Sequence, residues 1–443
     1  MNKRLFSVVL TIILTAATAA GQNTTVSKEL KADVNRAAGM SYAMPLPRQP
    51  KDTPVPGGKK PFYVNHYACS SGYYLDQPEN YEWPYSVFAH ADSVGKLTKL
   101  GRDVMQRLDL LRQEARGRTG ELTEKGAKQS RALMRQLVER LPDAFVPKGY
   151  YSARSVVDNR CIMTMQEAMV QLSAMRQQLQ QELRTSVREL RFMDPEDKLL
   201  TDRRTDSLTQ IRFDRFTALN TNDARLMTSL FSDQNYVISN IDATELSRQL
   251  FRLAGSIQHT ELAGKVTLFD IFTPEEIHCH WRNQNAWNYI NYGGCTLNGG
   301  TQPYLQRAVL RNMIHMGDSV LKRYAPMMHA RYTHQNVLMS LASLMELDNC
   351  GLQTDNLDSL ELAGWANYRI APLGGSIVMI HYRNGHDDPD VLVKVLLNGR
   401  EARLPIDTDC APYYHWQDVK RYYLRKLYRY ENMRFNGQEN SKK

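Results

Sequence analysis

The sequence predicts an α/β fold built around a mostly parallel sheet. An apolar run, a loop and a helical segment follow one another three times, starting near Phe62, Gly149 and Met327. This order is typical of parallel strands, because their crossover connections usually contain a helix. Two later apolar runs, Ser376–Arg383 and Val391–Gly399, flank the turn residues "GHDDP" and predict an antiparallel pair.

The three strands that start the repeated units are rich in β-branched and aromatic residues. They are expected at Phe62–Tyr67 ("FYVNHY"), Gly149–Val156 ("GYYSARSV") and Met327–His334 ("MMHARYTH"). Ligands of such sheets bind beyond the carboxyl ends of the strands. We therefore expect Cys69–Ser71, Ser155–Arg160 and His334–Asn336, which follow or end the strands, to meet in one pocket.

Apolar residues at helical spacing predict the helices. They are expected at about Ser93–Ala115, Gly120–Phe145, Arg160–Leu183, Asn336–Leu347 and Trp416–Tyr428. We predict a sheet core from residues 60–165 and 305–435, and an α-helical cap from residues 166–304 between them. Residues 22–60 are rich in Pro and Gly and predict an irregular N-terminal arm.

The first residues have the pattern of a signal peptide. Lys3 and Arg4 precede the apolar run Leu5–Leu14, and the small-residue segment Thr15–Gln22 follows. We expect residues 1–21 to be removed and the protein to be exported, to the periplasm or the medium. No later run reaches ~18 apolar residues, so no membrane span is predicted.

Charge and cysteine content indicate which kinds of ligand and which covalent links are expected. The 443-residue chain has a net charge of +9, which suits an anionic ligand or surface. Its basic residues are dispersed, so no nucleic-acid interface is predicted. Six cysteines form no CxxC pair and predict one or two disulfides plus buried thiols in an oxidising compartment. No metal or other cofactor is expected.

Two unusual segments have simple structural interpretations. His278–Trp281 ("HCHW") would place its histidines on one face of a strand, without the further ligands of a closed metal site. We interpret these histidines as structural. The glutamine-rich segment Gln177–Leu183 is interpreted as part of the core and solvent faces of the helical cap.

Four segments have a more specific pattern. They are "LT..G..Q" (Leu122–Gln129), "ARSVVDNRCIMTM" (Ala153–Met165), "ARYTHQNVLMSLASLMEL" (Ala330–Leu347) and the tail Val391–Tyr423. Together they resemble the histidine phosphatase superfamily, in its acid phosphatase and phytase branch, and especially bacterial proteins similar to multiple inositol polyphosphate phosphatase. The resemblance implies a three-layer α/β/α core with an inserted α-rich cap. It also implies an anionic small molecule as ligand, a phosphate ester such as an inositol phosphate.

The resemblance assigns roles to individual residues. Arg160 corresponds to a phosphate-binding arginine of the family, and His334 to its second catalytic histidine. Active members have Arg-His-Gly-x-Arg after the first strand, and that histidine accepts the phosphoryl group. The aligned segment here is "HYACSSGYYL". Cys69 and Tyr73 therefore replace the arginines, and Ser70 replaces the nucleophile.

The general acid of the family is also replaced. Members place Asp, or a nearby Glu, after the second histidine to protonate the leaving alcohol. Gln335 and Asn336 stand here, and an amide cannot donate a proton as a carboxylic acid does. The combined losses imply a protein that binds phosphate esters through Arg160 and His334 with little or no hydrolysis.

Other interpretations stay open. In a second register His66 is the nucleophile, and the protein is an active phosphomonoesterase of the phytase type. In a third interpretation, Tyr67, Tyr73 or Tyr74 fills the pocket and the protein is an interaction partner without a ligand. Cys69 lacks the arginine of a cysteine-phosphatase loop, since Leu75 stands in that position. A Ser70–His334 pair has no recognisable third member of a hydrolase triad.

Overall fold

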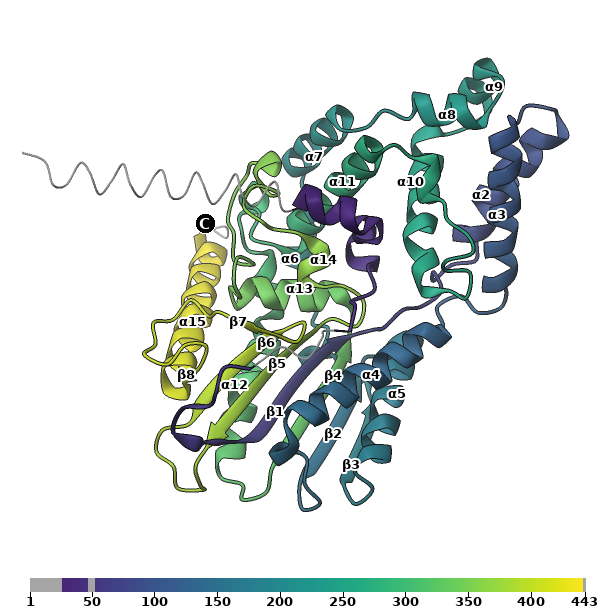
Figure 1. Cartoon of the computed structure of the whole chain (residues 1–443). Helices are drawn as coiled ribbons and strands as arrows, with labels where there is room; N and C mark the ends of the chain where they lie inside the picture. Colours follow the sequence, from purple (N-terminus) through teal and green to yellow (C-terminus); the bar gives the residue numbers. More distant parts are fainter. Residues whose placement is uncertain (1–25, 47–51, 441–443) are drawn as a thin grey trace, which may run out of the picture.

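A mixed sheet of eight strands lies at the centre of the protein, whose computed structural model describes residues 26–46 and 52–440 (Figure 1). The strands are β1 Lys60–Cys69, β2 Tyr150–Ser155, β3 Gln180–Thr185, β4 Met327–Thr333, β5 Ser376–Arg383, β6 Leu392–Leu397, β7 Arg400–Ala402 and β8 Tyr414–His415. Their order is β3-β2-β4-β1-β5-β6-β7, with β8 beside β6. The expected signal peptide lies outside the described residues.

The sheet has a parallel half and an antiparallel half. β3, β2, β4 and β1 run parallel, whereas β5 is antiparallel to β1 and β6 is antiparallel to β5. The three predicted parallel strands and the predicted antiparallel pair are thus confirmed. In the register, Cys69 of β1 faces Thr333 of β4, and Ser155 of β2 faces Tyr332. The carboxyl ends of β1, β2 and β4 therefore reach the same edge of the sheet.

Strand β3 was missed by the sequence prediction. The helix expected at Arg160–Leu183 is α5, which ends at Met175, and the chain then pairs with β2 as β3. Gln, Glu and Arg favour helices, but an edge strand needs pairing on one side only and can leave polar side chains in solvent. The assignment of Gln177–Leu183 to the helical cap is therefore wrong.

Helices cover both faces of the sheet and form a lobe beyond its edge (Figure 1). They are α2 Glu79–Ser93, α3 Lys99–Ala115, α4 Glu124–Arg140, α5 Asn159–Met175, α6 Lys198–Asp202, α7 Ser207–Leu219, α8 Ala224–Leu230, α9 Gln234–Asn240, α10 Ala243–Ser256, α11 Pro274–Tyr292, α12 Arg307–Leu321, α13 Gln335–Leu344, α14 Asn367–Ile370 and α15 Trp416–Asn440. α4 and α5 pack on one face, with Val64 and Ala68 of β1. α12, α13 and α15 pack on the other, with Tyr63 and Tyr67.

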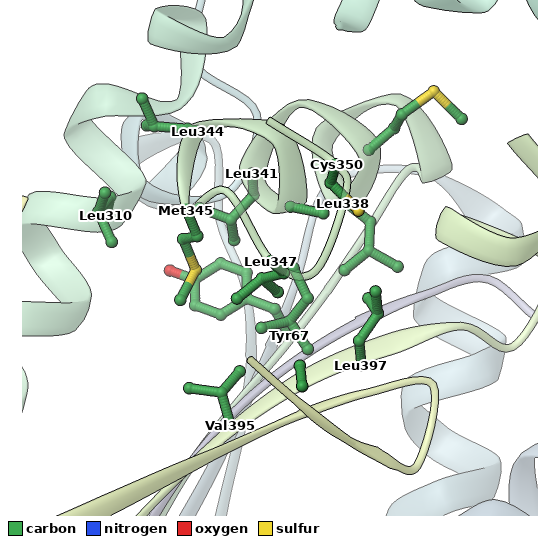
Figure 2. Packing of buried hydrophobic residues seen from close by; sticks show 14 of the residues in the cluster. Tyr67, Leu310, Leu338, Leu341, Leu344, Met345, Leu347, Cys350, Val395 and Leu397 are labelled. Carbon is green, nitrogen blue, oxygen red and sulfur yellow. The ribbon is translucent and has the colours of Figure 1, made fainter. Parts of the chain in front are cut away.

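The hydrophobic core under α13 fixes the carboxyl end of β4, where the candidate functional site lies. α13 is apolar around most of its circumference, and Figure 2 shows Leu341, Leu344 and the following Met345 above Tyr67 of β1 and Val395 of β6. Each such buried side chain contributes roughly 1.5–3 kcal/mol by leaving water. This packing fixes the position at which the chain passes from β4 into α13.

The helical lobe has its own core. α2 and α3 pack against α8, α10 and α11, and their shared cluster includes Val104, Leu108, Leu230, Leu250 and Trp281. The lobe therefore also draws on residues 79–115, which lie before the expected cap. No helix within residues 26–46 and 52–440 is long and apolar enough to cross a membrane.

Several helix boundaries differ from the sequence prediction, and the helix expected at Gly120–Phe145 is the shorter α4, Glu124–Arg140. The segment expected as one helix from Ser93 contains the end of α2 and the whole of α3. Gly95, with φ of 69°, lies between them, and the Thr98 side chain caps α3 by accepting from the Gly101 amide. The last helix, α15, begins at Trp416 as predicted and continues beyond Tyr428.

Candidate functional site

The segments that follow β1, β2 and β4 contact one another at the carboxyl edge of the sheet. The Ser71 amide donates to Thr164 Oγ1 of α5 at 3.2 Å. From the first turn of α5, the Cys161 thiol donates to the Thr333 carbonyl at 3.2 Å and lies 3.8 Å from His334 Nδ1. The structure thus brings together the three segments that were expected to converge.

Arg160 is the cation of this region. It stands at the start of α5, where Asp158 caps the helix by accepting from the Cys161 amide at 3.3 Å. Its Nη1 donates to Asp76 at 2.6 Å, its Nε lies 3.3 Å from Asp158, and its guanidinium lies 4.4 Å from the centre of the Tyr73 ring. Burial lowers the pKa of Arg160, but Tyr73 and the two carboxylates outweigh it and raise that pKa. The guanidinium is therefore charged and already has two anionic neighbours.

His334 lies directly after β4 and before α13. Its Nδ1 faces the Cys161 thiol, and its Nε2 lies 3.8 Å from an Asp194 carboxylate oxygen. Burial raises the pKa of Asp194, and His334 only partly offsets this effect. The imidazole thus stands between a thiol on one side and a carboxyl group on the other.

The loop after β1 differs from its two neighbours. The Cys69 thiol donates to the Pro372 carbonyl at 3.0 Å, and burial raises its pKa to about 12. Such a thiol forms little thiolate and is a poor nucleophile. Ser70 follows Cys69, so the β1–β4 register extended by one residue places it opposite His334. Its hydroxyl is buried and has no hydrogen-bond partner among the described residues.

His66, the alternative nucleophile, stands elsewhere on β1. It is paired with Ala330, four residues before His334, which corresponds to ~13 Å along a strand. It lines a cavity of about 190 Å³ between α4, α5 and the sheet, together with Met134 and Tyr332, and this cavity extends to Cys69 and Ser71 at the end of β1. Burial lowers the pKa of His66 to about 4, so the ring is neutral. The structure does not place His66 at the edge where Arg160 and His334 stand.

The two amides after His334 have different surroundings. Gln335 donates to the Met40 carbonyl at 3.1 Å, and so connects α13 to the N-terminal segment. The side-chain Oδ1 of Asn336 is buried and accepts no hydrogen bond in the part of the chain described. Asp194, which the sequence analysis missed, is the carboxyl group beside His334. Only the acidic run "MDPED" indicated it, and nothing in that run predicts contact with a residue so distant in the sequence.

Three tyrosines were considered as residues that could fill the site. Tyr67 donates from its hydroxyl to the Phe192 carbonyl at 2.9 Å, and Tyr74 donates to Glu114 at 3.1 Å. Both are thus held outside the candidate site. Only Tyr73 enters it, with its ring against the guanidinium described above.

The cysteine and histidine predictions need two corrections. All six cysteines lie within the described residues and are free thiols, so the predicted disulfides are wrong. "HCHW" lies on α11 and not on a strand. Its His278 Nε2 is 3.0 Å from Glu361, and its His280 Nε2 is 3.0 Å from Ser247. These bonds agree with a structural role for both histidines.

No protein-family model and no curated protein sequence matches the chain. Its structure, however, is similar to the Bifidobacterium longum multiple inositol polyphosphate phosphatase in complex with inositol hexasulfate. The TM-score is 0.73 at 11% identity, over 87% of this chain and 97% of that one. The same phosphatase in complex with phosphate gives 0.72 at 12% identity, over the same shares. The phytase from D. castellii gives 0.63 at 12% identity, over 89% and 85%.

These similarities establish the class of fold. The chain has the same fold as this multiple inositol polyphosphate phosphatase and this phytase. The predicted α/β core with an added helical lobe is confirmed. A shared fold does not fix the chemistry of a site, which depends on the chain's own residues.

Proposed function

We propose that the protein binds a phosphate ester at the carboxyl ends of β1, β2 and β4, and hydrolyses it slowly or not at all. The proposal rests on one arrangement: Arg160 and His334 stand at one sheet edge, and the residue opposite His334 is Ser70. A cation and an imidazole suit an anionic oxygen, whereas a serine hydroxyl that donates no hydrogen bond to a base is a weak nucleophile, and the Ser70 hydroxyl has no such bond within the described residues.

Two hydroxyl groups support anion binding at this edge. Ser70 and Ser71 are fully buried, and neither hydroxyl has a hydrogen-bond partner within the described part of the chain. A buried polar group without a partner costs about 1–3 kcal/mol. A phosphate oxygen that accepts from these hydroxyls would remove that cost.

The carboxylates beside Arg160 weaken binding without preventing it. Asp76 is 40% exposed in its ion pair with Arg160. Solvent-exposed ion pairs contribute only ~0–1 kcal/mol. The Arg160 side chain is 15% exposed, so this pair is stronger than a surface pair, and a ligand needs several phosphate groups to displace Asp76. The solved neighbours were obtained with phosphate and with inositol hexasulfate, which supports an inositol phosphate as the ligand class. We place this activity outside the cell, because of the signal-peptide pattern.

The first test combines thermal stabilisation with phosphate release. Inositol hexakisphosphate should raise the melting temperature of the purified protein, because a ligand at 100 times its Kd adds ~2.7 kcal/mol of stability. Arg160→Gln should abolish the shift. Arg131→Gln is the matched control, since the partly exposed Arg131 of α4 pairs with Glu167 of α5. Absence of any shift in the unmodified protein would contradict the proposal.

Phosphate release separates binding from catalysis. We expect little or no release of phosphate from inositol hexakisphosphate or from a chromogenic monoester. Release that disappears in a His66→Ala variant would establish the active phosphatase with His66 as nucleophile.

A second candidate function is an interaction protein that has no ligand. It is favoured by the contacts of Arg160, because the Tyr73 ring and Asp76 already occupy two of its sides. In that case the unmodified protein shows no thermal shift. An Asp76→Asn, Tyr73→Ala double variant would then gain one.

A further inference from the structure

Three potential metal ligands meet beside the candidate site. Asp158, Cys161 and His334 each offer one ligand atom, and these atoms all lie within 4.8 Å of one another. Asp158 and Cys161 are three residues apart at the start of α5, which places them on the same side of its first turn. His334 comes from the end of β4, so two separate elements supply the group.

The spacing fits a tetrahedral ion. Zinc bonds of ~2.3 Å to sulfur and ~2.0 Å to nitrogen, at a tetrahedral angle, place those two atoms ~3.5 Å apart. Cys161 Sγ and His334 Nδ1 are 3.8 Å apart. Small side-chain movements are therefore sufficient to close the site. Sulfur, imidazole nitrogen and carboxylate oxygen together are a ligand set that suits Zn²⁺.

The surroundings orient two of the ligands. Asp194 lies on the Nε2 side of His334, at 3.8 Å. A carboxylate there favours the tautomer with a proton on Nε2, which leaves Nδ1 free to bind a metal. The Cys161 amide and the Arg160 guanidinium both contact Oδ1 of Asp158. A metal ion would therefore be bound by the other carboxylate oxygen, Oδ2.

A second group of the same composition lacks these features. Asp409, Cys410 and His415 also lie within 4.8 Å of one another. However, both ring nitrogens of His415 already face carboxylates, Nδ1 at 2.7 Å from Asp390 and Nε2 at 3.1 Å from Asp409. The side chain of Asp409 is 82% exposed. This group is therefore the natural comparison in an experiment.

We infer that Asp158, Cys161 and His334 bind a zinc ion with one open position, and that this position takes an oxygen of the phosphate ester. The ligand part of this inference rests on the proposed function, whereas metal binding does not. Cys161 binds as a thiolate, and its proton is released to solvent. The ion supplies positive charge where Cys69 and Tyr73 replace the arginines of the related phosphatases.

The test measures the metal directly. Purified protein is loaded with Zn²⁺, dialysed, and analysed for zinc by mass spectrometry; Co²⁺ is used in parallel for its thiolate-to-metal absorption band. We expect one equivalent of zinc and a cobalt–thiolate band. Asp158→Asn should weaken zinc binding at least tenfold while it keeps the helix cap, because Asn also caps helices. Cys161→Ser should remove the band.

Two matched controls locate the site. Cys279→Ser removes a partly exposed thiol on α11, and Cys410→Ser disrupts the second group; both should keep zinc and the cobalt band. Zinc retained in Cys161→Ser, or lost in Cys410→Ser, would overturn the inference. Circular dichroism confirms that each variant is folded.

A separate arm distinguishes this inference from the proposed function. Thermal shifts with inositol hexasulfate are recorded in EDTA and with zinc-loaded protein. A shift that depends on Arg160, in a protein that binds no zinc, overturns the metal site alone. Zinc binding without any anion shift supports the metal site and contradicts the proposed function.

Discussion

The loop after β1 and the segments after β2 and β4 lie at the same sheet edge, but they differ in chemistry. The segments after β2 and β4 present Arg160 and His334, a cation and an imidazole. The loop after β1 presents a buried thiol, Cys69, followed by small residues. The fold thus fixes where groups meet and leaves open what they can do. A phosphatase fold is compatible with a site that binds its ligand without transferring a phosphoryl group.

The largest predicted loss of stability concerns α13, which packs on the sheet and supports the segment after β4. Leu341→Ala removes a fully buried side chain from the core under α13 (Figure 2). We expect the free energy of unfolding to fall by ~2–5 kcal/mol. Urea unfolding measures this change. Loss of less than about 1 kcal/mol would show that α13 is not a rigid support of His334.

The next effect concerns Asp197, close in sequence to Asp194. Its carboxylate pairs with Arg307 of α12 at 2.8 Å and with Arg434 of α15. Burial raises the pKa of Asp197, but Arg434 and Arg307 outweigh it and leave that pKa below its ordinary value. Asp197→Asn should reduce stability at neutral pH by ~1.5–3 kcal/mol.

The pH dependence of this effect follows from the sign of the shift. The pKa of Asp197 is lower in the folded protein than in the unfolded chain, where it is about 3.9. The ionised carboxylate therefore stabilises the folded protein above about pH 3.9, and this stabilisation is lost as the pH falls through the pKa of the folded state. The difference in free energy of unfolding between the original protein and Asp197→Asn should therefore become smaller below about pH 4. Chemical unfolding between pH 3 and pH 7 measures it, and a difference that grows on acidification would contradict the assignment.

A smaller loss of stability is expected for a change next to the loop after β1. A Cβ added to Gly126 of α4 would lie 2.0 Å from the Gly72 carbonyl oxygen, in the loop after β1. Gly126→Ala should therefore displace that loop and cost ~1–3 kcal/mol. Gly120→Ala is a useful comparison, because its Cβ meets nothing within 4 Å and tests only the strain at a φ of 75°. If Gly126→Ala alone weakens anion binding, the β1 loop contributes to the site.

The sequence predicted regular elements better than contacts between distant residues. Alternating and continuous apolar runs identified β1, β2, β4, β5 and β6, because burial on the sheet imposes those patterns. β3 was missed since an edge strand of Gln and Glu has no such pattern. Asp194 and His334 meet only through the fold, so no local spacing indicated their contact. Disulfides were predicted from compartment, which says nothing about whether the thiols approach one another.

Phosphorus NMR of the purified protein with inositol hexakisphosphate tests the central claim most directly, because one spectrum reports both binding and hydrolysis. We predict that the ligand signals shift or broaden with the original protein, but not with Arg160→Gln, and that the inorganic phosphate signal grows slowly or not at all. Rapid growth of inorganic phosphate would show an active phosphatase, and ligand signals that stay unchanged would show that the site binds no phosphate ester. Either result would contradict the account.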